Sequence, residues 1–448
     1  MYYKLYTVLG WLLVIAAMPF FVPFCLLTRK NLASLTQRFG FFNPRDTWKH
    51  KNRLWFHAAS VGEVQAAKAL ISPLIQSGVQ ADIIITTNTE QGHLTAIRQF
   101  GDTALCLYAP VDLPWVVERF IQKLNPSMYI CLETELWPNI LRLTRAHGVK
   151  TLLLNGRLSA NSFRKYQKIV GFMVQVLGCF DSASVIQTID RDRYLALGFD
   201  PAKIKVNGNA KYDLRIESLL APHESNPRLS GLALKETVAQ HYREMLGLRH
   251  NQPVLLAGST HAGEEAIMLA ALDALAATIP NLVLMIAPRH LDRLEQIKTA
   301  WLSKKVPFQT FRHAAENQLP SRVILVDRMG ELVKLYALAT YVFCGGSLVA
   351  RGGHNIMEPA SWGTPPFYGP HMNDFSDACT LLESQDAGYP IDNVQELVDK
   401  IRYFHQHQDK YQQASRRALA VASSQHGAAT KQVEMITQLL GCSSTCTN

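Results

Sequence analysis

The 448-residue sequence lacks several features that would mark common protein classes. It has no C-x-x-C pair, and its eight cysteines are scattered, which disfavours a disulfide framework or a zinc ribbon and indicates a reducing compartment. It has neither a G-x-G-x-x-G nor a Walker lysine motif, which disfavours dinucleotide and ATP chemistry. Charged residues make up only 18%, without a dense Lys/Arg tract, so we expect no binding of nucleic acid.

The length and the charge balance indicate what is present instead. A chain of 448 residues exceeds the size of one hydrophobic core, about 250 to 300 residues, so two domains are expected. The formal net charge of +9 suits anionic partners such as phospholipid headgroups or phosphorylated substrates.

The N-terminal segment is apolar from Leu5 to Leu27, long enough to cross a hydrocarbon layer of about 30 Å. We expect residues 1–30 to form a retained membrane anchor, because no small-x-small cleavage site follows. Pro19 and Pro23 leave open a helix that lies in the interface instead. Basic residues beyond the segment predict a cytoplasmic body; they are Arg29, Lys30, Arg38, Arg45, Lys49, Lys51 and Arg53.

Short apolar runs alternate with helical patterns through the rest of the chain, which is typical of parallel sheets covered by helices. The runs of the first series are Leu54–Ala58, Ile83–Thr86, Leu105–Tyr108, Met128–Leu132, Thr151–Leu154 and Ala183–Gln187. Those of the second are Val254–Ala257, Leu282–Ala287, Phe308–Phe311, Val323–Val326, Tyr341–Cys344 and Pro366–Tyr368. This pattern predicts an α/β fold with two tandem Rossmann-like domains.

The expected domain boundaries follow from this division. We place an N-terminal domain at 31–213, a polar linker at 214–250, a second domain at 251–425, and a C-terminal helix and tail at 426–448. In such a pair the ligand site is expected in a cleft faced by the carboxyl ends of both sheets. Functional motifs should therefore stand just after strands.

The first such motif is Ser60-Val61-Gly62-Glu63, which follows a strand and opens a helix. A base at Glu63 would reach a bound hydroxyl at the sheet edge. The same Ser-x-x-Glu spacing also forms a capping box, so both interpretations stand on pattern alone.

Three further motifs follow strands of the first domain. Glu133 and Glu135 come after an apolar strand, where they either face the cleft or complement the dipole of the next helix. Arg157 suits a phosphate or carboxylate, and Lys211 faces either the cleft or solvent. Asp190-Arg191-Asp192 resembles the metal-binding D-x-D of sugar transferases, but its position favours capping of the following helix.

Motifs of the second domain favour anion binding. Ser259, Thr260 and the residues after them open a helix whose free amide groups suit an anion. Pro288-Arg289-His290 places at the same edge two side chains that can carry positive charge. Gly345-Gly346 and Gly352-Gly353 allow close approach of backbone to phosphate, and Glu358 is placed to accept hydrogen bonds from a ribose diol. His354 alone is typical of a packed histidine.

The motifs HAASVGE, ETELWPN, NGRLS, GNAKYD, AGSTHAGEE, PRH, GEL, GGSL and GGHNIMEPA together resemble the family of 3-deoxy-D-manno-octulosonic acid (Kdo) transferases over essentially the whole chain. The resemblance implies the GT-B arrangement of two Rossmann-like domains and an inverting transfer of Kdo from CMP-Kdo to the lipid A precursor, lipid IVA. It also implies that the reaction takes place at the cytoplasmic face of the Gram-negative inner membrane. No metal or other cofactor is required.

The resemblance also implies roles for residues. Glu63 would be the general base, and Glu133 or Glu135 together with Lys211 would line the reaction centre. Ser60, Gly62 and Arg157 would contact the acceptor. The donor set would be Ser259, Thr260, Pro288, Arg289, His290, Gly330, Glu331, Leu332, Gly352, Gly353, His354, Asn355 and Glu358. A transferase for UDP-sugars and a non-hydrolysing sugar-nucleotide epimerase share this architecture and are the rival enzymes; a membrane-tethered nucleotide-binding scaffold without catalysis is the rival from another class.

Overall fold

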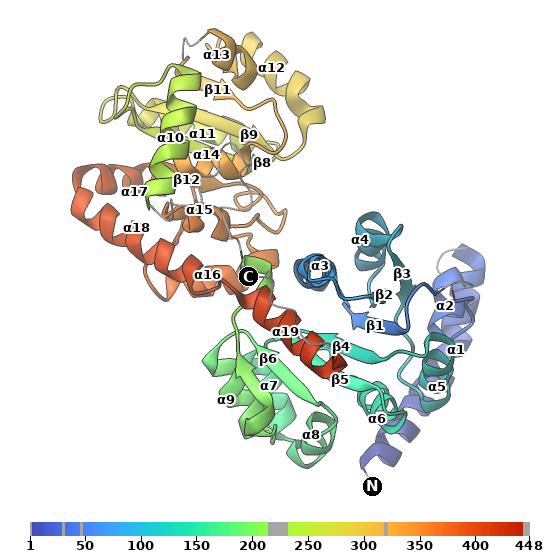
Figure 1. Ribbon diagram of the computed structural model, residues 1–448. Coiled ribbons are helices and arrows are strands. Elements are labelled where there is room, and N and C mark those ends of the chain that lie inside the picture. The colour runs from blue at the N-terminus through green and yellow to red at the C-terminus, as the bar shows by residue number, and fades with distance from the viewer. Residues whose placement is uncertain (1, 29–31, 45–47, 214–231, 318–320, 442–448) are drawn as a thin grey trace. The chain divides into compact units, whose positions relative to one another are not determined.

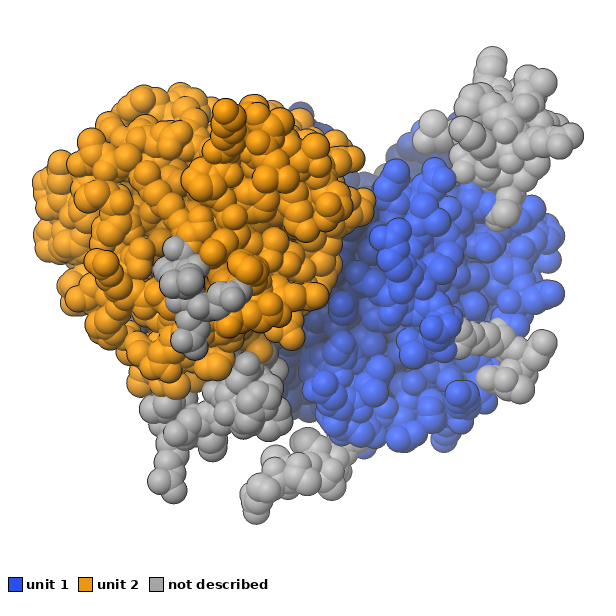
Figure 2. Space-filling model, turned by 90° about the horizontal axis from the view of Figure 1, so that it is seen from above, with its two compact units in different colours: residues 1–213, 427–448 blue, residues 214–426 orange. Residues whose placement is uncertain are grey.

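The computed structural model describes residues 2–28, 32–44, 48–213, 232–317 and 321–441. The chain forms two compact units, residues 1–213 with 427–448 and residues 214–426 (Figure 2). Each unit contains one seven-stranded parallel sheet with helices around it (Figure 1). The expected α/β fold with two parallel sheets is therefore confirmed. Residues 214–231 of the expected linker, 442–448 of the tail, and the basic residues Arg29, Lys30 and Arg45 lie outside the described residues.

The first sheet has the strand order β3-β2-β1-β4-β5-β6-β7. Its strands are β1 (Asn52–His57), β2 (Ala81–Thr87), β3 (Ala104–Tyr108), β4 (Met128–Leu132), β5 (Lys150–Gly156), β6 (Ser182–Val185) and β7 (Ile204–Val206). The order reverses between β1 and β4, which are hydrogen-bonded neighbours. In open parallel sheets this switch point is where loops diverge and ligands bind.

The helices of the first unit cover both faces of its sheet. They are α1 (Tyr2–Thr28), α2 (Leu32–Arg38), α3 (Val61–Gln76), α4 (Glu90–Phe100), α5 (Pro114–Leu124), α6 (Pro138–Ala146), α7 (Ala160–Gln167), α8 (Val170–Leu177), α9 (Thr188–Ala196) and, from the end of the chain, α19 (Ala428–Leu440). Strand side chains alternate between the faces. Leu54 and Phe56 pack with α3 and α19, whereas Trp55 packs with α5 and α6.

The C-terminal helix α19 completes the first unit, where it lies against α3 and β5 (Figure 1). Asp213 accepts hydrogen bonds from the backbone N–H groups of Gly427 and Ala429 at the start of this helix. The fully buried Gln432 accepts from the N–H of Asn155 at 2.9 Å and donates to the carbonyl of Gly208 at 3.3 Å. A single side chain from the far end of the sequence thus joins two loops at the edge of the first sheet.

The second sheet has the order β10-β11-β9-β8-β12-β13-β14. Its strands are β8 (Val254–Thr260), β9 (Val283–Pro288), β10 (Gln309–Thr310), β11 (Val323–Leu325), β12 (Tyr341–Cys344), β13 (Pro366–Tyr368) and β14 (Tyr389–Pro390). Here the order reverses between β8 and β12. Pro366 opens its strand, a position that tolerates the missing N–H.

The second sheet is covered by nine α-helices within the described residues. They are α10 (Leu232–Leu246), α11 (Glu264–Leu275), α12 (Leu294–Ser303), α13 (Phe311–Asn317), α14 (Leu332–Leu338), α15 (Met357–Ser361), α16 (Ser376–Glu383), α17 (Val394–Gln406) and α18 (Gln408–Ser423). Side chains of α11 and α17 bury one face of β8 and β9 in a common core.

The N-terminal helix α1 differs from the expected anchor. In the part of the chain that the structure describes, no helix is long and apolar enough to cross a membrane. The spanning anchor predicted for residues 1–30 is therefore not supported. One face of α1 instead packs against the rest of the first unit: Tyr6 donates a hydrogen bond to Asp112 at 2.9 Å, and Trp11 stacks on Trp115.

We predict that Gln432→Leu lowers the free energy of unfolding by about 2 kcal/mol, because it leaves the N–H of Asn155 and the carbonyl of Gly208 buried without their partner. Urea unfolding of the purified chain measures the change. Gln438→Leu is the matched control, since Gln438 is exposed on the same helix. Equal stability of the two variants would contradict the role given to Gln432.

Candidate functional site

The motifs of the first unit gather where its strand order reverses. Ser60 precedes α3, Gly62 and Glu63 lie in its first turn, and this turn directly follows β1. Glu133 and Glu135 follow β4, the neighbour of β1. The structure therefore brings these motifs to one edge of the sheet.

Glu63 is a buried carboxyl group, 7% exposed, that is held by local hydrogen bonds. One of its oxygens accepts from the backbone N–H of Ala59 at 2.8 Å, and the other from the hydroxyl of Ser60 at 3.2 Å. The Ser60 hydroxyl makes no capping bond to the amides of α3. The reciprocal capping box is therefore not formed, and Ser60 orients Glu63 instead.

Burial and neighbouring acids raise the pKa of Glu63 to about 8. Desolvation is the largest cause, and the charges of Glu133 and Glu135 add to it, while the hydrogen bond from Ala59 opposes it. The carboxyl group is thus mainly protonated at neutral pH, and once ionised it is a stronger proton acceptor than an ordinary carboxylate.

Glu133 is a buried carboxylate, 3% exposed, with two cationic partners. The Nζ atom of Lys211 lies 2.9 Å from one oxygen, and the Nε atom of Arg157 lies 2.8 Å from the other. Glu133 and Asn155 both adopt the left-handed backbone region, at φ values of 55° and 53°. Non-glycine residues in this region are uncommon and cluster at functional sites.

Glu135 differs from Glu133, because its side chain is 31% exposed and its partners are mainly neutral. It accepts hydrogen bonds from Trp137 Nε1 at 2.8 Å and Asn88 Nδ2 at 3.0 Å. The nearby imidazole of His57, whose Nε2 atom lies 3.7 Å from a Glu135 oxygen, is the largest cause of the lowered pKa of Glu135. The two acids that sequence reasoning could not separate therefore occupy distinct environments, one paired and buried, the other ionised and accessible.

His57, Asn88 and Trp137 were not nominated from the sequence. His57 ends β1 and belongs to the motif HAASVGE, and Trp137 directly precedes α6 and belongs to the motif ETELWPN. Their positions after strands at the sheet edge could have indicated a role in the site.

The Asp190-Arg191-Asp192 segment caps a helix. Asp190 accepts from the backbone N–H groups of Gln187 and Leu158, and forms a capping box with Gln187 at the start of α9. The capping interpretation is confirmed. Among the described residues, no group of three or more His, Cys, Asp or Glu side chains is arranged to hold a metal ion.

In the second unit a cluster of imidazoles and arginines stands beyond β8, β9 and β12. The Nε2 atoms of His261 and His354 lie 3.0 Å apart, their rings are stacked, and the ring of His290 packs edge-on against His261. Burial, followed by the charge of Arg289 and the two other imidazoles, lowers the pKa of His354 to about 4. The pair is therefore neutral, with one imidazole donating to the other. His261 is a further residue that was not nominated.

Glu358 and the second pair of glycines adjoin this cluster. Burial raises the pKa of Glu358 to about 7, although the hydrogen bond from Asn355 and the charge of Arg289 lower it. Gly352 and Gly353 have positive φ values of 83° and 79°. These φ values favour glycine at both positions, and a Cβ atom there would also displace the side chains of Asp374 and Met372.

The remaining nominated donor residues are largely engaged within the protein. The Thr260 hydroxyl donates to Glu265 at 3.1 Å, and the N–H of Arg289, just beyond Pro288, donates to the Thr260 carbonyl at 3.0 Å. Ser259 has a φ of 56°, Gly330 a φ of 84°, and Glu331 accepts from the Tyr242 hydroxyl. Leu332 begins α14 beside Gly258.

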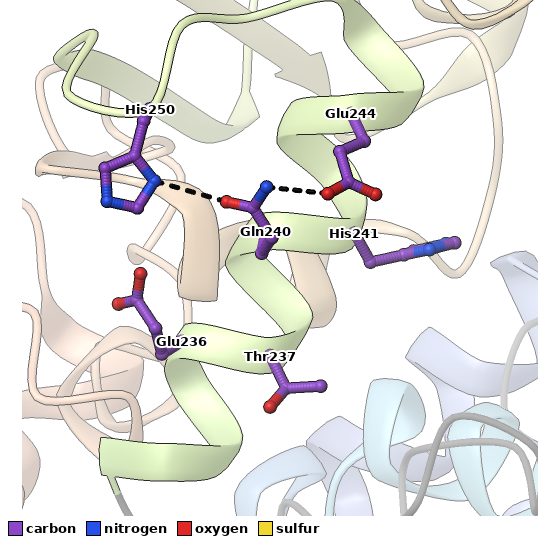
Figure 3. A pocket seen from close by; sticks show the side chains of 6 residues that line it. All are labelled: Glu236, Thr237, Gln240, His241, Glu244 and His250. Carbon is purple, nitrogen blue, oxygen red and sulfur yellow. Dashed lines mark hydrogen bonds between the residues drawn. The ribbon is translucent and has the colours of Figure 1, made fainter.

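A shallow hollow of about 560 Å³ lies on α10 away from these motifs (Figure 3). Gln240 crosses it between His250 and Glu244, with hydrogen bonds of 3.3 and 2.6 Å. A second hollow of about 500 Å³ shares Glu236 and His250 with it. Neither includes a residue nominated from the sequence.

Comparison with known proteins places the fold and the family. The structure of a putative UDP-N-acetylglucosamine 2-epimerase from Listeria monocytogenes is 13% identical in sequence to this chain and superposes with a TM-score of 0.51. The match covers 87% of this chain and 97% of the epimerase, so the two share a fold. Residues 33–214 match the family model described as 3-deoxy-D-manno-octulosonic-acid transferase (kdotransferase).

Two relatives are 3-deoxy-D-manno-octulosonic acid transferases. That of Haemophilus influenzae is 33% identical over 370 residues, which cover 82% of each chain. That of Aquifex aeolicus is 27% identical over 362 residues, covering 80% of this chain and 88% of the relative. A chain with this fold and these relatives is a glycosyltransferase. It belongs to the Kdo transferase family, as the motifs predicted.

We predict that Glu63→Gln stabilises the protein increasingly as the pH rises. Between the ordinary pKa of 4.5 and the folded value of about 8, the folded state keeps a proton that the unfolded chain has lost, so its stability falls with rising pH. The free energy of unfolding of the unchanged chain falls by up to about 1.4 kcal/mol per pH unit in this range, whereas that of the glutamine variant does not fall for this reason. Urea unfolding at pH 5 to 8 measures it, with the exposed Glu434→Gln as control. A pH-independent difference would contradict the raised pKa.

Proposed function

We propose that this chain transfers Kdo from CMP-Kdo to the lipid A precursor, lipid IVA, with inversion at the anomeric carbon, in the assembly of the lipopolysaccharide core. The observation that carries the proposal is the buried Glu63 carboxyl at the carboxyl edge of the first sheet, with its pKa raised to about 8. Family membership supports the sugar and the reaction.

In the proposed reaction the ionised Glu63 accepts the proton of the acceptor hydroxyl. The hydroxyl oxygen forms the new bond to the anomeric carbon of Kdo, and the bond from that carbon to the CMP phosphate oxygen breaks. The phosphate carries away the electron pair. A general base with a pKa near the working pH is effective because it combines an adequate ionised fraction with a strong pull on the proton.

The other acids support Glu63 in different ways. The charge of Glu133 is compensated by Arg157 and Lys211, which limits how far it raises the pKa of Glu63. Glu135 is ionised and accessible, so it is the acid of the two that can accept hydrogen bonds from acceptor hydroxyls. Ser60 orients Glu63, and Gly62 keeps the first turn of α3 free of a side chain beside it.

The second unit supplies the proposed donor site. CMP-Kdo carries a phosphodiester and a carboxylate, and Arg289 and His290 offer positive or donating groups beyond β9. Asn355 and Glu358 suit the ribose diol, and Gly353 allows close approach. The leaving phosphate is weakly basic, so charge stabilisation by Arg289 serves it more than protonation does. No metal is needed in this scheme.

Glu63→Gln should leave CMP binding intact and lower the rate of transfer by about 10² to 10⁴-fold, because the amide cannot take the hydroxyl proton. Incubation with CMP-Kdo and lipid IVA, followed by mass analysis of the lipid, measures transfer, and calorimetry measures CMP binding. Near-normal turnover would remove Glu63 from the role. Thermal protection by UDP but not by CMP would instead contradict the proposed donor.

The exposed face of α1 supports a membrane-surface location. Leu5, Val8, Leu9, Leu12 and Ile15 recur at helical spacing and are all more than half exposed. The neighbouring α8 adds exposed apolar residues, and its Phe172 packs against the tyrosines of α1. We therefore propose that α1 lies in the interface of the cytoplasmic leaflet of the inner membrane, where the lipid acceptor is found.

The double variant Leu9→Glu/Leu12→Glu should bind vesicles of anionic phospholipid at least about tenfold more weakly, since two apolar side chains no longer insert. Cosedimentation measures the affinity. Leu302→Glu, at a leucine of the second unit that is even more exposed, is the control and should bind as the unchanged chain does. Unaltered binding by the double variant would exclude α1 as the attachment surface.

A further inference from the structure

The glycine turn at residues 345–348, which follows β12, is rich enough in glycine for its backbone to approach a phosphate, but its N–H groups already bind a carboxylate of the protein. The N–H groups of Gly346, Ser347 and Leu348 donate to the Glu264 carboxylate at 2.8, 3.1 and 3.1 Å. The N–H of His261 donates to the same carboxylate at 2.9 Å. Concave sets of backbone N–H groups of this kind ordinarily bind phosphate or another anion.

Glu264 depends on these amides for its stabilisation. The residue is 0% exposed, and among the described side chains no Lys, Arg or His forms an ion pair with it. Its neighbour Glu265 is different, because it pairs with Arg293 at 2.9 Å. A buried carboxylate is costly unless strong hydrogen bonds replace its hydration, and four backbone donors supply them.

The carboxylate holds together two loops that belong to different strands. His261 follows β8 and the glycine turn follows β12. The approach is close: a Cβ atom on Gly345 would lie 2.6 Å from the Ser259 carbonyl and 2.9 Å from Glu264 itself. A Cβ on Gly346 would lie 3.1 Å from the ring of His354. The spacing of these loops therefore also sets the 3.0 Å contact between His261 and His354.

We propose that Glu264 is a positioning residue of the donor site, an internal anion that fills the glycine turn and fixes the imidazole pair beside it. The carbonyl of Gly346 also accepts a hydrogen bond from the N–H of Gly353, so the glycine turn also fixes the position of the second pair of glycines. The consequence for the ligand is that its phosphate binds on the side of Arg289 and His290, and not in the glycine turn. The donor part of this inference rests on the function proposed above.

The test compares Glu264→Ala with Leu272→Ala in the full-length chain. Leu272 is buried in the core two turns further along α11, so its truncation destabilises the same helix without touching the glycine turn. Two quantities are measured at temperatures where both variants are folded. They are the dissociation constant for CMP and the ¹⁵N chemical shifts of the imidazole nitrogens, which report the hydrogen bond between His261 and His354.

Glu264→Ala should lose the imidazole hydrogen-bond signature and bind CMP at least about tenfold more weakly, whereas Leu272→Ala should keep both within about twofold. Retention of the imidazole signature in Glu264→Ala would overturn the positioning role. Equal weakening of CMP binding in both variants would also overturn it, because general destabilisation would then suffice. Failure of the unaltered chain to bind CMP would count against the proposed function alone, since the imidazole signature still tests the role of Glu264.

Discussion

The structure of the first unit depends on how three carboxyl groups are accommodated at one edge of a parallel sheet. The three acids differ in the groups that stabilise them. Glu133 is paired with two cations, Glu135 is partly exposed beside the His57 imidazole and two neutral donors, and Glu63 has backbone and hydroxyl donors only. Because Glu63 is buried without a cationic partner of its own, its pKa rises, and once ionised it is a stronger proton acceptor than an ordinary carboxylate.

The scaffold around these acids brings together distant parts of the sequence. Lys211 stands on the short 3₁₀ segment Ala210–Tyr212, and Asn155, whose side chain accepts from the N–H of Ala210, stands at the end of β5. Both loops are tied to α19 through Gln432 and Asp213. The end of the chain thus supports the partner of Glu133. The second unit uses the same principle, with Glu264 joining the loops that follow β8 and β12.

Much of the fold was predictable from hydrophobic pattern, because buried parallel strands are continuous apolar runs. The bounds predicted for Met128–Leu132, Tyr341–Cys344 and Pro366–Tyr368 agree with β4, β12 and β13. The edge strands β7 and β14 were missed, since three and two residues are too few to show a pattern. The apolar N-terminal run predicted a spanning helix, because hydropathy alone does not show that Tyr6 and Trp11 face protein partners.

The sequence predicted which residues lie at the candidate site, but not which of its acids are paired and which are charged. Placement of motifs after strands indicated Glu63, Glu133, Glu135 and Lys211, and the structure shows the Lys211 contact directly. Which acid is paired depends on side chains such as Arg157 and Trp137, whose directions no sequence spacing gives. The glycine-rich turn was interpreted as a place for phosphate, and only coordinates reveal that Glu264 already occupies its amides.

The ionisation of Glu63 itself is the most direct test of the account. Infrared difference spectroscopy of the full-length chain, with Glu63→Gln to assign the carboxyl band, gives the pH at which this group loses its proton. The account predicts a midpoint at about 8, and a lower midpoint when Glu133→Gln removes the neighbouring charge. A midpoint near the ordinary value of 4.5, or one that Glu133→Gln leaves unchanged, would contradict it.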